Sequence, residues 1–237
     1  MKEKEKINNA LSGFYFYSGI GWHLLPPNER KYFVENSNKL FLKKGKILFR
    51  QGSFPNGVYV LRTGKLKVYQ QNYDGTIQIL FIYAANEVFG YRPILSNEYQ
   101  PLNVAAIENC ELLFLERTFF LELLKKSLSL SNQLLVSLSH EFTVLTNRLN
   151  VFAQRGIKER LALALLILNE KFRTPENKDD ISEIKMNRTD LANYVGTSLE
   201  NLGRTLTTFK EKRLIRTKGK IIFIEDFENL FVLTTLE

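Results

Sequence analysis

Polar and apolar residues alternate in short runs between residues 40 and 116. The runs at 65–69 (KLKVY) and 76–80 (TIQIL) have the period of two that is typical of half-buried strands. Glycines separate the runs, and Asp74-Gly75 is a hairpin signal because this pair accepts the positive φ of a tight turn. The pattern predicts an antiparallel β-barrel or β-roll, preceded by a helix around residues 26–38 that begins at two prolines.

A helical period follows the β segment. Seven apolar residues recur at steps of 7, 3, 4, 3, 4 and 3, which is the a/d seam of a coiled coil, interrupted only at Ser131. A helix over this segment is about 36 Å long. The seam predicts a parallel dimerisation helix; the alternative is a helix packed on its own domain, which has similar spacing and a wider apolar stripe. The seam residues are Leu128, Leu135, Leu138, Phe142, Leu145, Leu149 and Phe152.

The last third of the chain has the order of a winged helix-turn-helix. A second, more buried helix is expected at 159–172 (ERLALALLILNEKF). Two short helical stretches then fill 189–210 and are separated by Gly196, and two short strands flank Gly219. Helix, helix and small hairpin, in this order, predict a winged reading unit.

Capping residues mark where the two short helices begin. Asn187 is the expected N-cap of the first, and Asp190 three residues later favours the same helix end. Thr197 and Glu200 have the pattern of a capping box that opens the second helix.

The second short helix combines an inward apolar face with polar residues suited to reading bases. Leu202 and Leu206 are expected to anchor it from beneath, and Glu200, Asn201 and Arg204 to lie on its outer, N-terminal side. Arginine pairs bidentately with guanine O6 and N7, and glutamate accepts from cytosine N4. The alternatives are that Glu200 only caps the helix and that Arg204 is a solvated surface arginine.

Positive charge favours the reading of DNA. The formal net charge is +8, which favours a polyanionic partner, nucleic acid ahead of a membrane surface. A cationic strip beside the reading helix is suited to neutralising phosphates. It consists of Arg204, Lys210, Lys212, Arg213, Arg216, Lys218 and Lys220, against the two acids Glu200 and Glu211.

Composition excludes several other classes of protein. One cysteine, Cys110, and two histidines, His23 and His140, are too few for a structural zinc or an iron–sulfur cluster, and we expect no haem. Cys110 is expected to be a small buried apolar residue. The longest apolar run, 161–168, is far below the roughly 20 residues that span a bilayer, and MKEKEKINNA is unlike a signal peptide. No nucleophile–base arrangement is present, and a cupin-type enzyme would need more histidines, so we expect no enzyme.

At this point the chain resembles the Crp/Fnr family of bacterial transcription regulators, typified by the cyclic-AMP receptor protein. The resemblance covers about residues 40–226. It implies an α+β fold with an effector-sensing β-roll resembling a cyclic-nucleotide-binding jelly roll (domain 1–120), a dimerisation helix (121–154) and a winged helix-turn-helix (155–237). The motifs that carry it are GKILFRQG, VYVLRTGKLKVY, DGT, VFG and RTDLANYVGTSLENLGRTLTTFKEKRLI.

The resemblance also implies roles in DNA binding. The family's base-reading glutamate falls on Glu200 and its distal arginine on Arg204. Leu199 stands where the cyclic-AMP receptor protein has another arginine, so we expect a different half-site, and Thr205 stands where a larger apolar residue is usual. Expected phosphate contacts are Arg188, Thr189, Ser198, Lys210, Lys212, Lys218 and Lys220.

The effector cassette departs further from the family. The cyclic-nucleotide version has Gly-Glu and, some ten residues later, Arg-Ser, whereas this chain has Gly90-Tyr91 and Pro101-Leu102. A buried phosphate without its guanidinium is costly, and Arg92 stands at the wrong end of the cassette to replace it. We therefore expect these residues to form an effector pocket for an unidentified signal and not for cyclic AMP.

The leading hypothesis is a homodimeric, cytoplasmic, sequence-specific regulator of transcription. Its partners would be double-stranded DNA, a second copy, an unidentified small-molecule effector and RNA polymerase, contacted through the loop at 173–180 (RTPENKDD); no membrane is involved. The alternative is a ligand-binding or scaffold module that docks on a protein through its basic C-terminal domain.

Overall fold

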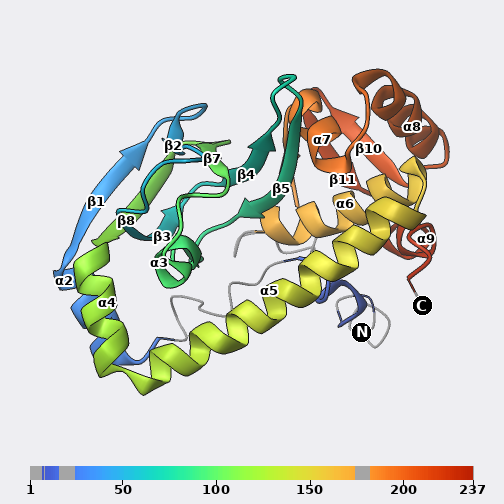
Figure 1. Ribbon diagram of the computed structural model, residues 1–237. Coiled ribbons are helices and arrows are strands. Elements are labelled where there is room, and N and C mark those ends of the chain that lie inside the picture. Colours follow the sequence, from blue (N-terminus) through green and yellow to red (C-terminus); the bar gives the residue numbers. More distant parts are fainter. Residues whose placement is uncertain (1–6, 8, 16–24, 174–181, 237) are drawn as a thin grey trace. The chain divides into compact units, whose positions relative to one another are not determined.

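The structure is a computed structural model that describes residues 7, 9–15, 25–173 and 182–236. Figure 1 shows the helices and strands. The contacts divide the chain into two compact units. One comprises Phe16–Phe142, and the other comprises Met1–Tyr15 together with Thr143–Glu237. Each is described by itself.

The first unit is built on two antiparallel four-stranded sheets, with strand orders β1-β8-β3-β6 and β2-β7-β4-β5. The predicted β-roll is therefore confirmed, and Asp74-Gly75 connects β4 to β5. The strands are β1 (Ser37–Leu42), β2 (Ile47–Phe49), β3 (Gly57–Thr63), β4 (Leu66–Gln71), β5 (Ile77–Tyr83), β6 (Val88–Phe89), β7 (Asn103–Ala106) and β8 (Cys110–Glu116).

The core of this unit joins the first sheet to the helices that flank it in the chain. Val58 and Val60 of β3 are fully buried, as β-branched residues of a central strand often are. The Tyr59 ring lies 5.4 Å from that of Phe89 and 4.9 Å from that of Phe114, distances at which aromatic pairs attract one another. The helices are α2 (Pro27–Glu35), α3 (Arg92–Ser96), α4 (Arg117–Lys126) and α5 (Leu128–Gln154).

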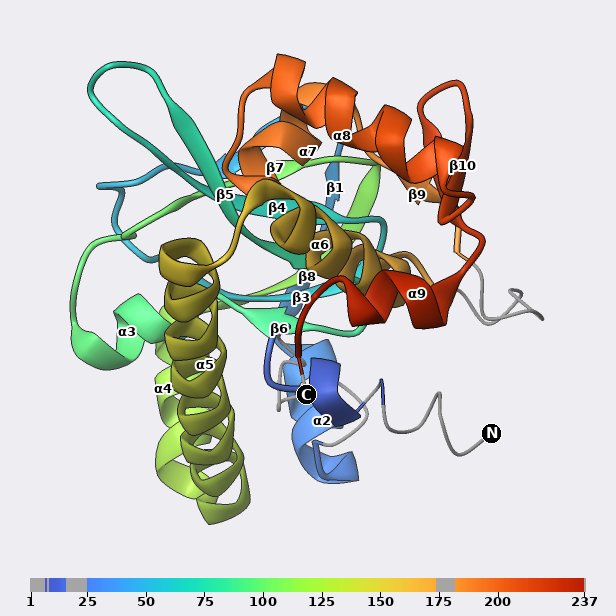
Figure 2. The ribbon, with the colours of Figure 1, turned by 90° about the vertical axis from the view of Figure 1, so that its right-hand side faces the viewer.

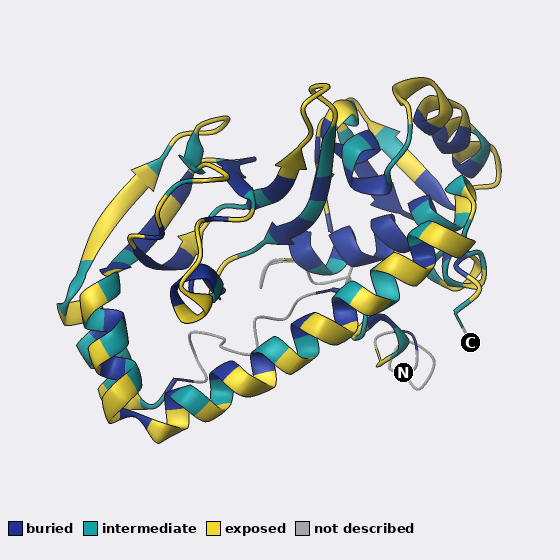
Figure 3. Cartoon of the chain, viewed as in Figure 1, coloured by how far each residue is buried: buried dark blue, intermediate teal, exposed yellow. Residues whose placement is uncertain are grey.

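Helix α5 is continuous and contains the whole predicted seam. One line of the seam is exposed: Leu128, Leu135, Phe142 and Leu149 follow one another at seven-residue steps and are 63–77% exposed. Exposed and buried stretches alternate along α5 in Figure 3. The other line, Leu138, Leu145 and Phe152, is half-buried. A neighbouring face packs on its own chain through Leu130, Leu134, Val144 and Val151. The helix thus buries one face in its own chain and presents another to solvent.

The second unit surrounds an apolar helix, α6, whose run 161–168 is entirely buried. Helices α7 and α8 and the C-terminal helix pack against it (Figure 2). A three-stranded sheet of order β10-β11-β9 completes the unit; the predicted hairpin is β10–β11, and β9 and α9 were not expected. The elements are α6 (Ile157–Phe172), β9 (Ile184–Lys185), α7 (Arg188–Val195), α8 (Leu199–Glu211), β10 (Ile215–Lys218), β11 (Ile221–Ile224) and α9 (Phe227–Val232).

A buried polar cluster fastens α5 to the first unit. The hydroxyl of Tyr91 lies 2.6 Å from Oε1 of Glu141 and 3.1 Å from Oγ of Ser137, both on α5. Nε of Arg92 lies 2.7 Å from Oε2 of the same carboxylate. Burial raises the pKa of Glu141, and the Arg92 guanidinium opposes that rise. The buried carboxylate therefore depends on the groups that surround it.

Removing the Tyr91 hydroxyl tests this cluster. We expect Tyr91→Phe to lower the free energy of unfolding by about 1–3 kcal/mol, because Glu141 stays buried and loses one of its hydrogen bonds. The measurement is the urea midpoint. Tyr99→Phe, at an exposed position, is the control and should leave the midpoint unchanged; equal midpoints for both variants would contradict the role given to the hydroxyl.

Candidate nucleic-acid interface

Helix α7 begins and ends where the sequence predicts. The side chain of Asn187 accepts a hydrogen bond from the Asp190 amide at 2.7 Å, which is the expected N-cap. Gly196 has φ of +72°, a conformation that glycine adopts without the Cβ penalty, and its amide donates to Ala192. These two residues fix the length of α7 and the turn into α8.

Helix α8 begins one residue later than the capping-box pattern indicates. Ser198 is the N-cap and accepts from the Asn201 amide at 3.2 Å, so the prediction that Thr197 caps this helix with Glu200 was wrong. With Ser198 as the N-cap, Glu200 stands at the second helical position and not at the third, from which a capping-box side chain reaches back. Glu200 instead forms an ion pair with Arg204, one turn along the helix.

One face of α8 is buried in its own unit. Leu202, Leu206 and Phe209 are at most 5% exposed. Thr205 is buried too, and its hydroxyl donates to the carbonyl of Asn201 at 2.8 Å, so the polar atom is satisfied where an apolar residue was expected. The helix contacts α6, α7 and β10, which hold its axis in place.

The opposite face carries the three predicted base-reading residues. The side chains of Glu200 and Arg204 are 71% and 73% exposed, and Asn201 is exposed as well. Figure 3 shows α8 with both exposed and buried stretches. All three lie in the first half of α8, close to its capped N-terminus. The structure therefore brings them together on a solvent-facing surface from which polar groups can reach a ligand.

Cationic side chains flank this surface. Lys210 and Lys212 stand at the end of α8, and Lys218 and Lys220 at the tip of the β10–β11 hairpin; all four are exposed. Arg188 is half-buried and donates to the carbonyl of Lys220 at 3.3 Å, and burial lowers its pKa. Thr189 and Ser198, the other two expected phosphate contacts, are exposed at the N-termini of α7 and α8.

A groove of about 200 Å³ runs along α8 beside β10. Arg188 and Lys210 line it together with three residues that sequence reasoning did not select, Gly203, Thr207 and Thr217. Helical spacing alone places Gly203 and Thr207 together, since they are four residues apart. Thr217 is brought to them by the hairpin, and no local pattern in the sequence indicates this.

The expected effector residues do not form a site for an anionic nucleotide. Tyr91 and Arg92 are engaged by the buried carboxylate of Glu141, which would repel a cyclic phosphate placed beside them. Pro101 is exposed and Leu102 half-buried just before β7, and Gly90 has φ of +92°. A cyclic nucleotide therefore does not fit these residues.

The residues of this chain do not fit an iron–sulfur cluster either. Such a cluster takes about four thiolate ligands, and the chain has a single cysteine. Burial raises the pKa of the Cys110 thiol to about 11, which keeps it protonated. Among the residues that the structure describes, no group of three or more His, Cys, Asp or Glu side chains is arranged to hold a metal ion; His140 is half-buried and His23 lies outside those residues.

No helix within the described ranges is both long and apolar enough to cross a membrane.

Comparison with known proteins identifies both units. Residues 39–127 match the family model of the cyclic nucleotide-binding domain, and residues 159–231 match that of the Crp-like helix-turn-helix domain. The transcriptional activator protein Anr of Pseudomonas protegens is 31% identical over 188 residues, 78% of this chain and 75% of that protein. The fumarate and nitrate reduction regulatory protein of Yersinia pestis is 28% identical over 192 residues, 80% of this chain and 75% of that protein.

A solved structure has the same fold. The structure of FixK2 from Bradyrhizobium japonicum matches with a TM-score of 0.77 at 19% identity and covers 85% of this chain and 98% of that one. Two matched domains in the expected order, and relatives that cover most of the chain, lead to one conclusion. The chain belongs to the Crp/Fnr family, whose members are transcription regulators and not enzymes, and it is itself a DNA-binding regulator of transcription.

Proposed function

We propose that this regulator binds as a homodimer to a near-palindromic site and reads each half-site with α8. The observation that carries the proposal is the division of α8 into two faces. Leu202, Leu206 and Phe209 are buried, while Glu200 and Arg204 project from the opposite side. A helix held from beneath in this way is suited to entering a major groove with its N-terminal residues first.

Base reading requires the Glu200–Arg204 pair to separate. In the protein alone the two side chains neutralise each other in an exposed i,i+4 pair, which stabilises a helix by only about 0.3–0.5 kcal/mol. A good bidentate contact with a base contributes about 1–3 kcal/mol of discrimination. It is therefore favourable to replace the contact between Glu200 and Arg204 by two contacts with bases, of Arg204 with a guanine and of Glu200 with a cytosine amino group.

Phosphate contacts would supply most of the affinity. We assign them to Arg188, Thr189, Ser198, Lys210, Lys212, Lys218 and Lys220, which lie at helix N-termini, at the end of α8 and on the hairpin. Cationic side chains at these places neutralise phosphates and release counterions, which makes binding strongly dependent on salt. Because such contacts carry no sequence information, they fix the register in which the base-reading residues act.

The exposed line of α5 is assigned to the dimer. Four large apolar residues at seven-residue spacing form a stripe that water solvates poorly. A second copy of α5 in parallel would cover it, and Leu138, Leu145 and Phe152 would flank the contact as the second line of the seam. The two copies of α8 would then face successive major-groove turns about 34 Å apart.

Further partners follow from the family. We propose that domain 1–120 senses a signal other than an anionic cyclic nucleotide, that 121–154 dimerises and that 155–237 binds DNA. The regulator would act in the cytoplasm and contact RNA polymerase; most of the loop suggested for that contact (173–180) lies outside the described residues, namely 174–180.

Substitution of Arg204 tests the reading assignment. Sites selected from random duplexes supply the specific ligand. We expect Arg204→Ala to weaken binding to the selected site about 5–150-fold, the equivalent of about 1–3 kcal/mol, and to leave salt-sensitive binding to unrelated DNA largely intact. Lys212→Ala, the control, should weaken both by similar factors because it removes a phosphate contact. Gel-shift competition distinguishes the two; a uniform loss for Arg204→Ala would refute its base-reading role.

The seam is tested by placing charge in it. Leu135→Glu with Phe142→Glu should give monomers by light scattering and weaken binding to the full site at least tenfold, because each substitution buries a carboxylate in the dimer contact. Both positions are exposed in the single chain, so its fold should tolerate them. Ser129→Glu with Asn150→Glu adds the same charge at exposed positions outside the seam and should leave the dimer intact. Persistence of dimers in the first variant would rule out this seam.

A further inference from the structure

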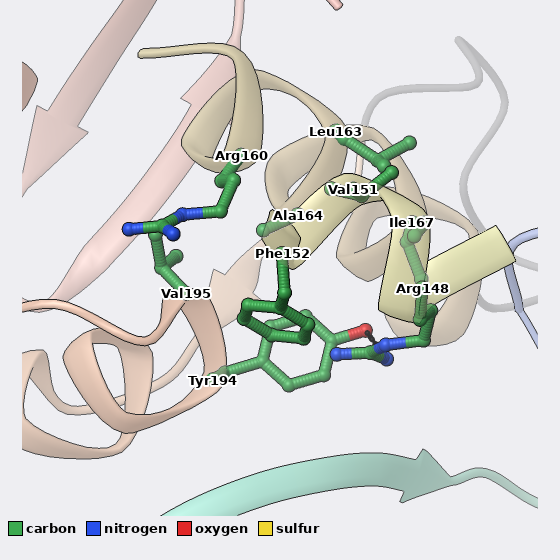
Figure 4. Close-up of a pocket in the computed structure, with 9 residues that line it drawn as sticks. All are labelled: Arg148, Val151, Phe152, Arg160, Leu163, Ala164, Ile167, Tyr194 and Val195. Carbon is green, nitrogen blue, oxygen red and sulfur yellow. Dashed lines mark hydrogen bonds between the residues drawn. The ribbon is translucent and has the colours of Figure 1, made fainter. Parts of the chain in front are cut away.

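Two arginines and two aromatic rings meet where the last turns of α5 approach α7 (Figure 4). Arg148 and Phe152 belong to α5, Arg160 to α6 and Tyr194 to α7. Together with the carbonyl of Gly196 we call them the arginine clamp. The four side chains help to line a cavity of about 30 Å³, no larger than a water molecule occupies, so the cluster is a packed contact and not a ligand pocket.

Arg148 joins α5 to α7. Its guanidinium carbon lies 4.8 Å from the centre of the Tyr194 ring and 5.8 Å from that of Phe152. Nη1 also donates to the Tyr194 hydroxyl at 3.2 Å. Stacking and hydrogen bonding together fix the direction of the side chain, which a flexible lysine would not do.

Arg160 makes the corresponding contact from α6. Its guanidinium carbon lies 5.8 Å from the Phe152 ring centre, and Nη2 donates to the carbonyl of Gly196 at 3.1 Å. That carbonyl stands at the C-terminal, negative end of α7, where a cation is favourable. Both arginines therefore hold the end of α7 that leads directly into α8.

The arginine clamp reinforces the short connection between α5 and α6. Helix α5 ends at Gln154 and α6 begins at Ile157, so only Arg155 and Gly156 connect them. A short link that contains glycine permits rotation, which the clamp opposes by tying both helices to α7. In agreement, the contacts of the chain group α5 from Thr143 onward with the DNA-binding unit.

We infer that Arg148 and Arg160 are positioning residues that set the direction of the reading helix relative to the dimer seam. The ring centre of seam residue Phe152 lies 5.8 Å from the guanidinium carbon of each arginine, and α7 and α8 both pack on α6. A dimer that reads two half-sites must hold its two copies of α8 at one separation and one rotation, and the clamp supplies that constraint. The inference rests on the proposed function, since it presupposes a dimer reading paired half-sites.

Half-site spacing is the readout that tests the inference. The probes are duplexes with the selected half-sites at their preferred spacing and with one or two base pairs inserted or removed; each base pair turns one half-site by about 34° relative to the other. We expect the wild-type dimer to lose at least about tenfold in affinity for a one-pair change. Arg148→Met with Arg160→Met keeps aliphatic bulk and removes the hydrogen-bond donors. At the preferred spacing we expect this variant to bind about tenfold more weakly than the wild type. When the spacing is changed by one base pair, we expect its affinity to fall by less than about threefold more.

Two controls separate positioning from stability. Lys158→Met removes a cation from an exposed position on α6 and should retain the wild-type spacing profile. Arg148→Met with Arg160→Lys keeps a donor for the Gly196 carbonyl. It should therefore show more of the wild-type spacing preference than the double methionine variant does. If the double methionine variant does not fold, as judged by circular dichroism, Tyr194→Phe removes only the Arg148 hydrogen bond and should flatten the profile to a smaller degree.

The outcomes of the spacing experiment distinguish a positioning role from a contribution to stability alone. A variant profile parallel to that of the wild type, with equal loss at every spacing, would show that the clamp contributes stability alone and would overturn the inference while leaving the proposed function intact. A wild-type protein that binds all spacings equally would overturn both. A flattened profile in dimers of normal melting temperature would support the positioning role.

Discussion

The proposed reading of DNA depends on the burial of one face of α8. A short helix that lay free on the surface would be marginal in water, and its outer residues would have no fixed direction. Leu202, Leu206 and Phe209 bury that face against the rest of the unit. The buried side chains contribute stability of about 1.5–3 kcal/mol each, so they and not the capping residues account for most of the stability of α8. The exposed face is thereby left to carry polar groups whose own contacts are weak and exchangeable.

Helix α5 is attached at two places along its length. Its middle is fastened by the buried carboxylate of Glu141 to Tyr91 and Arg92, and its last part by Arg148 to Tyr194. Both attachments use charged groups that are partly or fully buried, where removing a partner is costly. The exposed apolar line runs along the same helix, on another face. A signal that alters the first attachment would act on the same helix that carries the second, which is how a family with a sensing unit and a reading unit can couple the two.

Local patterns in the sequence predicted most of the fold, because the features concerned are local. The β-roll, the continuous α5, the N-cap at Asn187 and the turn at Gly196 all follow from periodicity and from single-residue preferences. The cap at Ser198 was missed because Thr197 and Ser198 satisfy the same preference, and only tertiary packing selects between adjacent hydroxyl residues. The two faces of α8 followed from spacing, and the base-reading roles of Glu200 and Arg204 stay predictions. The clamp was not predicted, since its members lie up to 48 residues apart and nothing local relates Arg148 to Tyr194 or Arg160 to Gly196.

The central claim is that two copies of α8 read related half-sites in successive turns of one DNA groove. Selection of bound sequences from a random duplex pool, followed by hydroxyl-radical footprinting of the enriched DNA, tests it most directly. The account predicts a two-fold symmetric consensus containing a G·C pair in each half, with two protected patches about one helical turn apart on one side of the duplex. Enrichment of no sequence, or of a single unpaired motif protected over one patch, would contradict it.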